Sequence, residues 1–590
     1  MKKNKKGIEN IKRSISLIQL QDKKFLFMSL VTTVLLSLFP VCSLLIMQSI
    51  INYIQIGTLD MKLIAILVLF YIAIDIIQTI VQVIWQQYNL KFSLNFKLYI
   101  ETLLQKKIKN MNLSDYETSE IYDQLQLAQS QNGTQLLETI NLLIQLIGSI
   151  TGIVSHILIL IHFKAWIIVV IMILPAVKYI VTNQLNQEQY DIVTSRATGA
   201  RKIWYWNYLI TSGRHFKELT VYHLFDFFIQ KYRKESEKFN GQDIKLSKKR
   251  NLFLTILTVI EILINGLVFS FIIYSGYIGV ILIGNIITYT RSIIATKSGV
   301  DTSLNTISTI KQSSLYINLF FEFLDLPSKE MGDKNLQIIK KIDSIEVRNL
   351  SFRYKGKSQY TIKNMSFTLK RDQLTVIVGE NGAGKTTLAK ILIGFYDEYE
   401  GEIYINGVDL KQINKEEYMA LIATVFQDFT QYEATVKENI GYGNLKAIDE
   451  EDRIKEVQAV FQSNFLPLHA QIGNWFDDGT QISMGQWQKI ALSRAFLKDA
   501  DLYLLDEPNA ALDPISEFEI AQLYHKILKN KLGIIIAHKF NHFIFNADNI
   551  LVIEDGEIKE QGTHEELLQN KNKYYELFSV QSETGKNHVL

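Results

Sequence analysis

The sequence predicts a membrane domain of six helices with long cytoplasmic extensions, followed by an α/β domain that binds a phosphate group. Charge-poor apolar runs are concentrated before about residue 310, and a phosphate-loop motif lies in the second half of the 590-residue chain. Apolar residues make up 48% of the chain and charged residues only 21%. This length has room for several domains of about 100–200 residues each. We therefore place the membrane domain at 1–325, a linker at 326–342 and the second domain at 343–590.

Six apolar stretches approach the length of about 20 residues that crosses a bilayer. They run over 25–47, 63–85, 139–163, 165–181, 253–275 and, more weakly, 283–307. Buried helices of a large soluble core are the alternative, but so many nearly uncharged runs favour membrane spans. Basic residues are clustered before Phe25, which predicts a cytoplasmic N-terminus. Six crossings return the chain to the cytoplasm, so we expect a multi-pass protein of the cell membrane with both termini inside.

Two long connections, 86–138 and 182–252, are too polar for the membrane but rich in helix-forming residues. We interpret each as two membrane helices that extend beyond the bilayer and meet at a short turn. Their tips, near 115–122 and 207–216, are then expected to contact the second domain.

Polar side chains inside the spans form a separate candidate site. Such groups usually face a bundle interior or a wet cavity, which predicts a translocation path. The alternative is that the basic ones snorkel to a helix end or pair with Glu261 for structure alone. The candidates are Asp75, Glu261, Asn285, Thr288, Tyr289, Arg291 and Lys297.

Charge and cysteine usage exclude several functions. The balance of 62 basic against 60 acidic side chains gives no indication of a nucleic-acid partner. Cys42 is the only cysteine and lies in the first apolar run, so we expect neither an internal disulfide nor a cysteine peptidase. The run from Phe25 is also too long for a cleavable signal peptide. The ten histidines show no ligand cluster.

The phosphate loop follows a predicted buried strand at 374–378 and precedes a predicted helix at 387–394. Glycines and a helix N-terminus let backbone N–H groups converge on an anion. Lys385 is expected to reach the β and γ phosphates of a nucleotide, and Thr386 to bind Mg²⁺. The predicted loop residues are Gly379, Glu380, Asn381, Gly382, Ala383, Gly384, Lys385, Thr386 and Thr387.

Two carboxylates follow a second apolar strand about 120 residues further on. Asp506 at the strand end suits coordination of Mg²⁺, and Glu507 suits polarising the water that attacks the γ phosphate. His538 ends a third buried strand, 532–537. The sequence thus predicts a nucleotide-hydrolysing site.

These residues, in this order and spacing, resemble the ATP-binding-cassette domain, and the apolar half resembles a six-helix half-transporter of the exporter type. The resemblance rests on Tyr354, the phosphate loop, Gln427, the run 482–486, Asp506, Glu507, the run 511–513 and His538. It implies ATP and Mg²⁺ as cofactors and a second copy of the chain as partner, since two cassettes close over two nucleotides.

The resemblance also implies a role for each matching residue. Tyr354 would stack on adenine, Gln427 would contact Mg²⁺ and the attacking water, and His538 would contact the γ phosphate. The nucleotide held by the opposite subunit would be contacted by Ser483, Gly485 and Gln486. Asp513 would link the two sites. The family signature usually reads L-S-G-G-Q, and Met484 replaces its first glycine, but the intact carboxylates and Lys385 favour a working ATPase.

The cassette is similar, more narrowly, to those of nisin- and subtilin-type lantibiotic exporters of Gram-positive bacteria. The similarity rests on runs 425–429, 473–476, 486–492 and 506–514. The alternative is that Trp475 and Trp487 merely pack the cassette. We therefore predict an ATP-driven exporter of a peptide precursor that keeps its leader, with modification enzymes as a further partner to test. A lipid or hydrophobic-drug exporter and a regulatory ATP-binding membrane protein without turnover are the alternatives.

Overall fold

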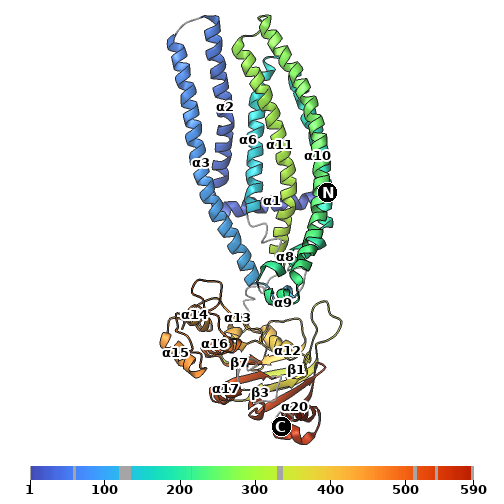
Figure 1. Ribbon diagram of the computed structural model, residues 1–590. Coiled ribbons are helices and arrows are strands. Elements are labelled where there is room, and N and C mark those ends of the chain that lie inside the picture. The colour runs from blue at the N-terminus through green and yellow to red at the C-terminus, as the bar shows by residue number, and fades with distance from the viewer. Residues whose placement is uncertain are drawn as a thin grey trace. The chain divides into compact units, whose positions relative to one another are not determined.

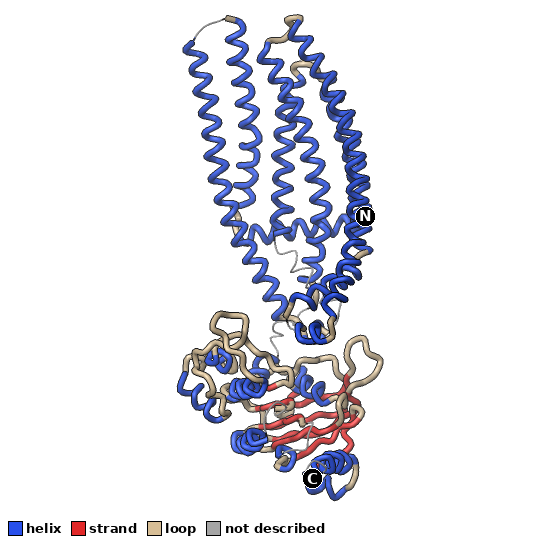
Figure 2. The backbone as a smooth tube through the Cα atoms, viewed as in Figure 1, coloured by secondary structure: helices blue, strands red, loops and turns tan. Residues whose placement is uncertain are grey.

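The computed structural model describes residues 2–57, 61–117, 134–213, 215–327, 336–508, 514–537 and 542–586. The chain divides into two compact units, which we treat separately. The first comprises Met1–Lys109 and Asp123–Leu326, and the second comprises Asn110–Tyr122 and Pro327–Leu590. Figure 2 shows that the strands belong to the second unit, whereas the first is built from helices.

The first unit, the helical unit, is built mainly from long helices that run side by side (Figure 1). In chain order they are α1 (Lys2–Gln21), α2 (Phe25–Ile56), α3 (Met61–Lys109), α6 (Thr134–Ile161), α7 (Trp166–Ser195), α8 (Ala197–Thr211), α9 (Phe216–Val221), α10 (Leu224–Tyr277) and α11 (Ile283–Leu324).

Five helices of the described residues, α2, α3, α6, α7 and α10, are long and apolar enough to cross a membrane. Each contains one of the first five predicted spans. The sixth predicted span lies at the start of α11, which is helical but does not reach the same apolar character. Arg291 and Lys297 account for part of this difference, because charged residues lower the hydropathy of the segment most strongly.

The predicted helical extensions are present. With 49 and 54 residues, α3 and α10 are about 74 and 81 Å long, far more than the roughly 30 Å of a hydrocarbon core. The second connection differs from the prediction, because the helix breaks at Arg196 before continuing as α8. Helix α8 ends at Thr211, within the predicted tip at 207–216, and the short helix α9 then precedes α10.

The N-terminal helix α1 lies across α11, α6 and α2. Asn10 donates to Asn318 of α11 over 2.6 Å, and Arg13 forms a two-pronged ion pair with Asp325 at 2.6 and 2.7 Å. These contacts join the first helix of the helical unit, α1, to the end of its last helix, α11.

The second unit, the cassette unit, contains two sheets. The antiparallel sheet has the order β2-β1-β4-β5, and the larger sheet has the order β10-β9-β3-β8-β7-β6. In the larger sheet β6, β7, β8, β3 and β9 are parallel and β10 is antiparallel. The strands are β1 (Ser344–Phe352), β2 (Ile362–Lys370), β3 (Leu374–Gly379), β4 (Glu400–Ile405), β5 (Val408–Asp409), β6 (Ile422–Val425), β7 (Leu502–Asp506), β8 (Leu532–Ile536), β9 (Asn549–Glu554) and β10 (Glu557–Gly562).

Burial follows the strand patterns that the sequence predicts. Strand β2 alternates buried and exposed residues, as an antiparallel strand with one wet face does. By contrast, β7 and β8 are buried throughout, as central parallel strands covered on both faces are. The predicted strands at 374–378 and 532–537 are confirmed within one residue at each end.

Helices cover these sheets. They are α4 (Leu113–Tyr116), α12 (Lys385–Leu392), η1 (Leu410–Gln412), α13 (Lys415–Ala420), α14 (Val436–Gly441), α15 (Glu451–Val460), α16 (Met484–Phe496), α17 (Pro514–Ile527), α18 (His542–Phe545), α19 (His564–Asn570) and α20 (Lys573–Lys586). Helices α14, α15 and α16 share a small core of their own, in which Trp487 is 4% exposed. Trp475, by contrast, is 83% exposed, so only Trp487 has the packing role considered above.

Candidate nucleotide site

The phosphate loop joins β3 to α12 inside the six-stranded sheet. Gly382 and Gly384 have φ of 82° and 100°, in the left-handed region that glycine tolerates best. A Cβ at Gly384 would lie 2.8 Å from the carbonyl oxygen of Thr361, so this turn has no room for a side chain. At Gly382 and Gly384 the loop is bare backbone, which lets a phosphate approach its N–H groups closely.

Lys385 begins α12 and is 4% exposed. Its Nζ donates to the carbonyl oxygens of Gly379 at 2.8 Å and Glu380 at 2.9 Å. Burial lowers the pKa of Lys385, although the carboxylates of Glu507 and Asp506 oppose this shift. The acceptors of the ammonium group are neutral carbonyl oxygens. An anionic phosphate that takes their place binds the ammonium group more strongly, because hydrogen bonds between charged groups are stronger than those to neutral ones.

The two carboxylates end β7 beside this loop. Asp506 is 1% exposed and accepts a hydrogen bond of 2.9 Å from Thr386 Oγ1. This places two of the three predicted Mg²⁺ ligands side by side, and a hydroxyl with a carboxylate is a donor set suited to that ion. The described residues contain no cluster of three or more His, Cys, Asp or Glu side chains that holds a metal by itself.

Glu507 is fixed from several directions. Its carboxylate accepts from Gln427 Nε2 at 3.1 Å, and its carbonyl accepts from Gln488 Nε2 at 3.1 Å. Its backbone has φ of 51°, a left-handed conformation that costs a residue with a side chain about 1–3 kcal/mol. Such strain is found most often at functional sites, where it aims a side chain.

The electrostatics of Glu507 suit a base. Burial raises its pKa, and the charge of Lys385 and the hydrogen bond from Gln427 partly offset that shift. A carboxylate with a raised pKa binds a proton more readily than an ordinary glutamate, which is what proton abstraction from water requires.

Tyr354 is half-buried at the end of the antiparallel sheet and packs against its core. Its hydroxyl shares a hydrogen bond of 2.8 Å with Thr387 of α12. The ring meets Phe352 and Tyr396 edge-on, at centroid distances of 5.2 and 5.8 Å. The predicted adenine contact is therefore linked directly to the helix that carries the phosphate loop.

The signature residues cap a different helix. Ser483 is the N-cap of α16: it accepts from Gln486 N at 3.3 Å, and its own N–H donates to Gln486 Oε1 at 2.9 Å. Met484 is 49% exposed, and its sulfur accepts from Gln431 at 3.3 Å. Among the described residues, no hydrogen bond or ion pair joins Ser483, Gly485 or Gln486 to the phosphate loop of the same chain.

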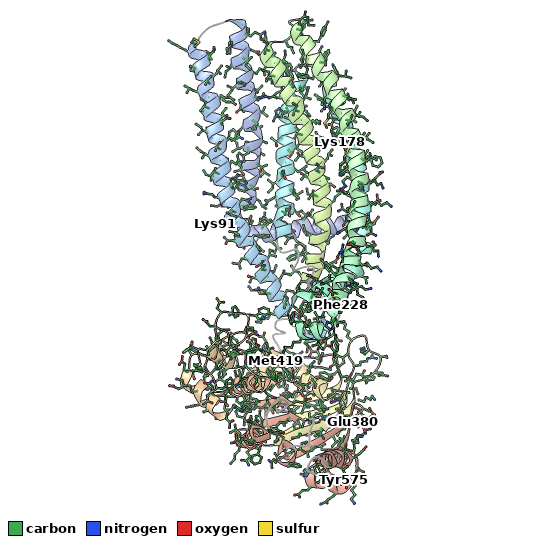
Figure 3. The ribbon with its side chains drawn as sticks, in the orientation of Figure 1. Lys91, Lys178, Phe228, Glu380, Met419 and Tyr575 are labelled. Carbon is green, nitrogen blue, oxygen red and sulfur yellow. The ribbon has the colours of Figure 1, made fainter. Side chains whose placement is uncertain are left out.

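The other predicted positions are distributed as follows. Ala383 is buried in the loop, Asn381 is exposed, and Glu380 turns outward to form an ion pair of 2.9 Å with Lys573 (Figure 3). Asp513 and His538 lie outside the described residues, so their predicted roles stay predictions.

The sequence predicts a contact of the tip near 115–122 with the second domain but not Tyr396, the cassette residue that makes it. Tyr396 donates a hydrogen bond of 2.5 Å to Glu117, and Leu113 packs against the core of the antiparallel sheet. The predicted tip at 115–122 therefore contacts the second domain through Glu117, while 118–122 lie outside the described residues. A tyrosine four residues after the end of a helix carries no signal of its own, so only the fold identifies Tyr396.

The polar groups of the helical unit form two small networks. Glu261 is 3% exposed and is bonded to Lys178 and, at 3.3 Å, to Lys297, which joins α10, α7 and α11. Figure 3 labels Lys178 among these helices. At the start of α11, Asn285 accepts from Gln48 and Asn52 at 2.6 and 2.9 Å.

The remaining candidates are separate from these networks. Asp75 accepts from Ser43 at 3.2 Å, Arg291 is exposed, Thr288 is buried, and Tyr289 stacks on Phe163. The pairing of Lys297 with Glu261 matches the structural alternative, and a path lined by these groups stays a prediction.

Comparison with known proteins adds independent information. Residues 362–510 match the model of the ABC transporter family. Over 553 residues the chain is 34% identical to the subtilin transport ATP-binding protein of Bacillus subtilis, covering 92% of this chain and 90% of that one. Over 574 residues it is 31% identical to the nisin transport ATP-binding protein of Lactococcus lactis subsp. lactis, covering 96% and 95%.

Two further comparisons concern fold and cargo. A solved bacterial Atm1-family ABC exporter with ATP bound superimposes with a TM-score of 0.74 at 19% identity, over 97% of this chain and 98% of that chain. Relatives called ATP-dependent lipid A-core flippases are 32–36% identical, but the matches cover only 44–50% of this chain.

Proposed function

This chain belongs to the ABC transporter family, and we propose that it is an ATP-driven exporter that moves a lantibiotic-type peptide precursor out of the cell as a homodimer. Its cassette is the ATP-hydrolysing part of a transporter, which excludes the regulatory alternative without turnover. The observation that carries the cargo assignment is the extent of the matches. Those to the subtilin and nisin transport proteins include the membrane half, where cargo passes, whereas those to the flippases cover about half of the chain.

We propose the hydrolytic roles that the family resemblance implies, supported by the contacts described above. Lys385 and the loop N–H groups would bind the β and γ phosphates, and Thr386, Asp506 and Gln427 would hold Mg²⁺. When bound, Mg²⁺ neutralises the charge that develops on the phosphates. Glu507 accepts the proton of the attacking water while Gln427 orients that water. Glu507 and Gln427 are 3.1 Å apart, within reach of one water molecule.

Two chains are proposed to form two composite sites. Ser483 and Lys385 head different helices, and no bond joins them within one chain among the described residues. A two-fold pair brings the signature of one protomer to the phosphate loop of its partner. Mixing inactive Lys385→Ala with inactive Ser483→Arg chains then places both lesions in one site and leaves the other intact. Recovery of turnover supports the dimer, and full activity of a purified monomer contradicts it.

The cassette side is proposed to face the cytoplasm of a Gram-positive bacterium, where ATP is available. Basic residues flank the membrane spans on that side, including Lys106, Lys107 and Lys109 at the end of α3. We also propose a complex of peptide-modification enzymes as a partner on the cytoplasmic side.

The test is to delete the gene in its host and follow the candidate precursor in cells and medium by mass spectrometry. We expect accumulation inside the cells, with secretion restored by the wild-type gene and by Glu456→Gln on the exposed face of α15. Glu507→Gln makes the same chemical change at the proposed base and is expected not to restore secretion. Unchanged peptide secretion together with a loss of lipid or drug efflux would favour the lipid or drug alternative.

A further inference from the structure

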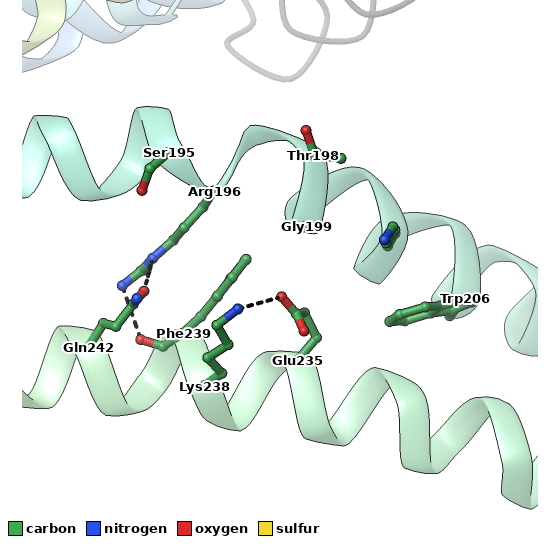
Figure 4. A pocket seen from close by; sticks show the side chains of 10 residues that line it. Ser195, Arg196, Thr198, Gly199, Trp206, Glu235, Lys238, Phe239 and Gln242 are labelled. Carbon is green, nitrogen blue, oxygen red and sulfur yellow. Dashed lines mark hydrogen bonds and ion pairs between the residues drawn. The ribbon is translucent and has the colours of Figure 1, made fainter.

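A cavity of about 350 Å³ lies between α8 and α10 of the helical unit (Figure 4). One wall is the junction of α7 and α8, and the other is the facing surface of α10. Gly199 sits where the helices approach most closely: a Cβ there would come within 2.7 Å of the Phe239 ring. Ligand pockets usually have volumes of about 300–1,000 Å³, so this cavity is among the smaller ones. Its volume is sufficient for a few side chains of a bound peptide.

The lining is predominantly basic. It contains Arg196, Lys202 and Lys238 but only one carboxylate, Glu235. The Arg196 guanidinium already has partners in the protein. It donates to Gln242 at 2.7 Å and to the Phe239 carbonyl at 3.2 Å, and it forms an ion pair with Asp243.

The other two cations are less constrained. The ammonium group of Lys238 is 3.5 Å from Glu235, a loose pair between partly exposed groups. Lys202 is exposed, and in the described part of the chain it takes part in no hydrogen bond or ion pair. One positive charge at the cavity is therefore available to an anionic ligand.

Two aromatic side chains complete the lining. Trp206 and Phe239 are half-buried, and the Arg196 guanidinium lies 4.8 Å from the Phe239 ring centroid, which holds that ring in place. A ligand that fits this lining has a carboxylate for Lys202 beside an aliphatic or aromatic group for the two rings.

The cavity lies beyond the bilayer. Helix α7 has 30 residues and is about 45 Å long, whereas a bilayer with its headgroups is about 40–45 Å thick. The candidate span begins at Trp166, and Ser195 is about 44 Å further along the helix, so this span places the cavity after Ser195 at or past the opposite headgroups. On α10, Gln242 is about 52 Å from Tyr277 along the helix axis. This depth favours a soluble segment over a lipid.

From this position, charge and shape we propose that the cavity binds an acidic segment of the peptide cargo, with an apolar residue next to the acidic one. The assignment rests on the proposed function and gives the peptide a contact site before it enters the membrane.

The binding test uses the full-length protein in phosphatidylcholine nanodiscs without ATP. The probe is a fluorescein-labelled hexapeptide, Gly-Asp-Leu-Asp-Phe-Gly, and its counterpart carries Lys in place of Asp. We expect the acidic probe alone to bind and Lys202→Glu to weaken it at least tenfold. Lys234→Glu makes the same charge change on exposed α10 outside the cavity, and we expect less than a twofold effect and wild-type basal ATPase.

Location is tested by placing benzoylphenylalanine at Trp206. A light-induced crosslink to the acidic probe supports the assignment, whereas a crosslink to a second copy of the chain shows that the cavity is an interface and overturns it. Equal binding of both probes, or no effect of Lys202→Glu, also overturns it. So does displacement of the probe by inorganic phosphate or by phosphatidylglycerol in the nanodisc, which would assign the cavity to an anion or a lipid.

The outcome is separable from that of the proposed function. If secretion of the precursor depends on Glu507 but the acidic probe does not bind, only the cavity assignment fails. If the probe binds at the cavity but the deletion strain still secretes the precursor, the peptide-export function fails and the cavity is not a cargo site.

Discussion

The hydrogen bond between Tyr396 and Glu117 is predicted to hold α4 on the cassette unit, and Tyr396→Phe removes it. The bond is 2.5 Å long, and hydrogen bonds to charged groups contribute about 1.5–3 kcal/mol. Glu117 is exposed and regains water when the bond is lost, so we take the lower end, about 1.5 kcal/mol. Because 1.4 kcal/mol is a factor of ten, local detachment of α4 should become about tenfold more frequent.

The assay is amide hydrogen exchange of the segment 112–117 in the full-length protein. Burial and the hydrogen bond that Tyr396 donates to Glu117 raise the pKa of Tyr396, so its hydroxyl remains a donor at any working pH. The control is Tyr360→Phe, which removes a similar 2.6 Å bond to Glu400 at the edge of the antiparallel sheet. Unchanged exchange in Tyr396→Phe, or equal acceleration in the control, would refute the reasoning.

Three further predictions concern the site and the helical unit. Burial raises the pKa of Glu507, so ATPase activity should already decline at a pH above the usual pKa of a glutamate as the pH is lowered. Burial lowers the pKa of Lys385, so on the alkaline side activity should decline at a pH below the usual pKa of a lysine. A pH profile with both limbs at the usual pKa values would contradict this prediction. Met484→Gly should keep or raise ATPase activity, because the half-exposed side chain has one weak polar contact; a large loss would reveal a positive role. Glu261→Gln should destabilise the protein on the scale of about 3–5 kcal/mol, because two lysines lose their partner; an unchanged unfolding midpoint in nanodiscs would oppose it.

Much of the fold is readable from the sequence because its signals are local. A charge-free run long enough to cross a bilayer, or a strand followed by a glycine loop and a helix, is contained in one segment. The phosphate loop, Asp506 and Glu507 were therefore predictable, and the sheet brings them together because β3 and β7 both flank β8.

Other features depend on partners far apart in the chain. Arg13 pairs with Asp325, and Tyr396 donates a hydrogen bond to Glu117. The pattern of apolar and polar residues in the sequence does not predict either contact. The break at Arg196 also has no proline or glycine to mark it, and it becomes evident only where α8 departs from α7. The strained backbone of Glu507 is likewise a property of the folded sheet, not of the sequence motif.

The most direct test of ATP-driven peptide export is uptake into sealed proteoliposomes with the cassettes facing outward. Mg-ATP and a fluorescent precursor peptide are added outside, and peptide inside the vesicles is measured over time. We predict accumulation with the wild type and with Glu456→Gln, and none with Glu507→Gln or without ATP. ATP hydrolysis by the wild type without any accumulation of peptide, in vesicles that instead move a labelled lipid, would contradict the account.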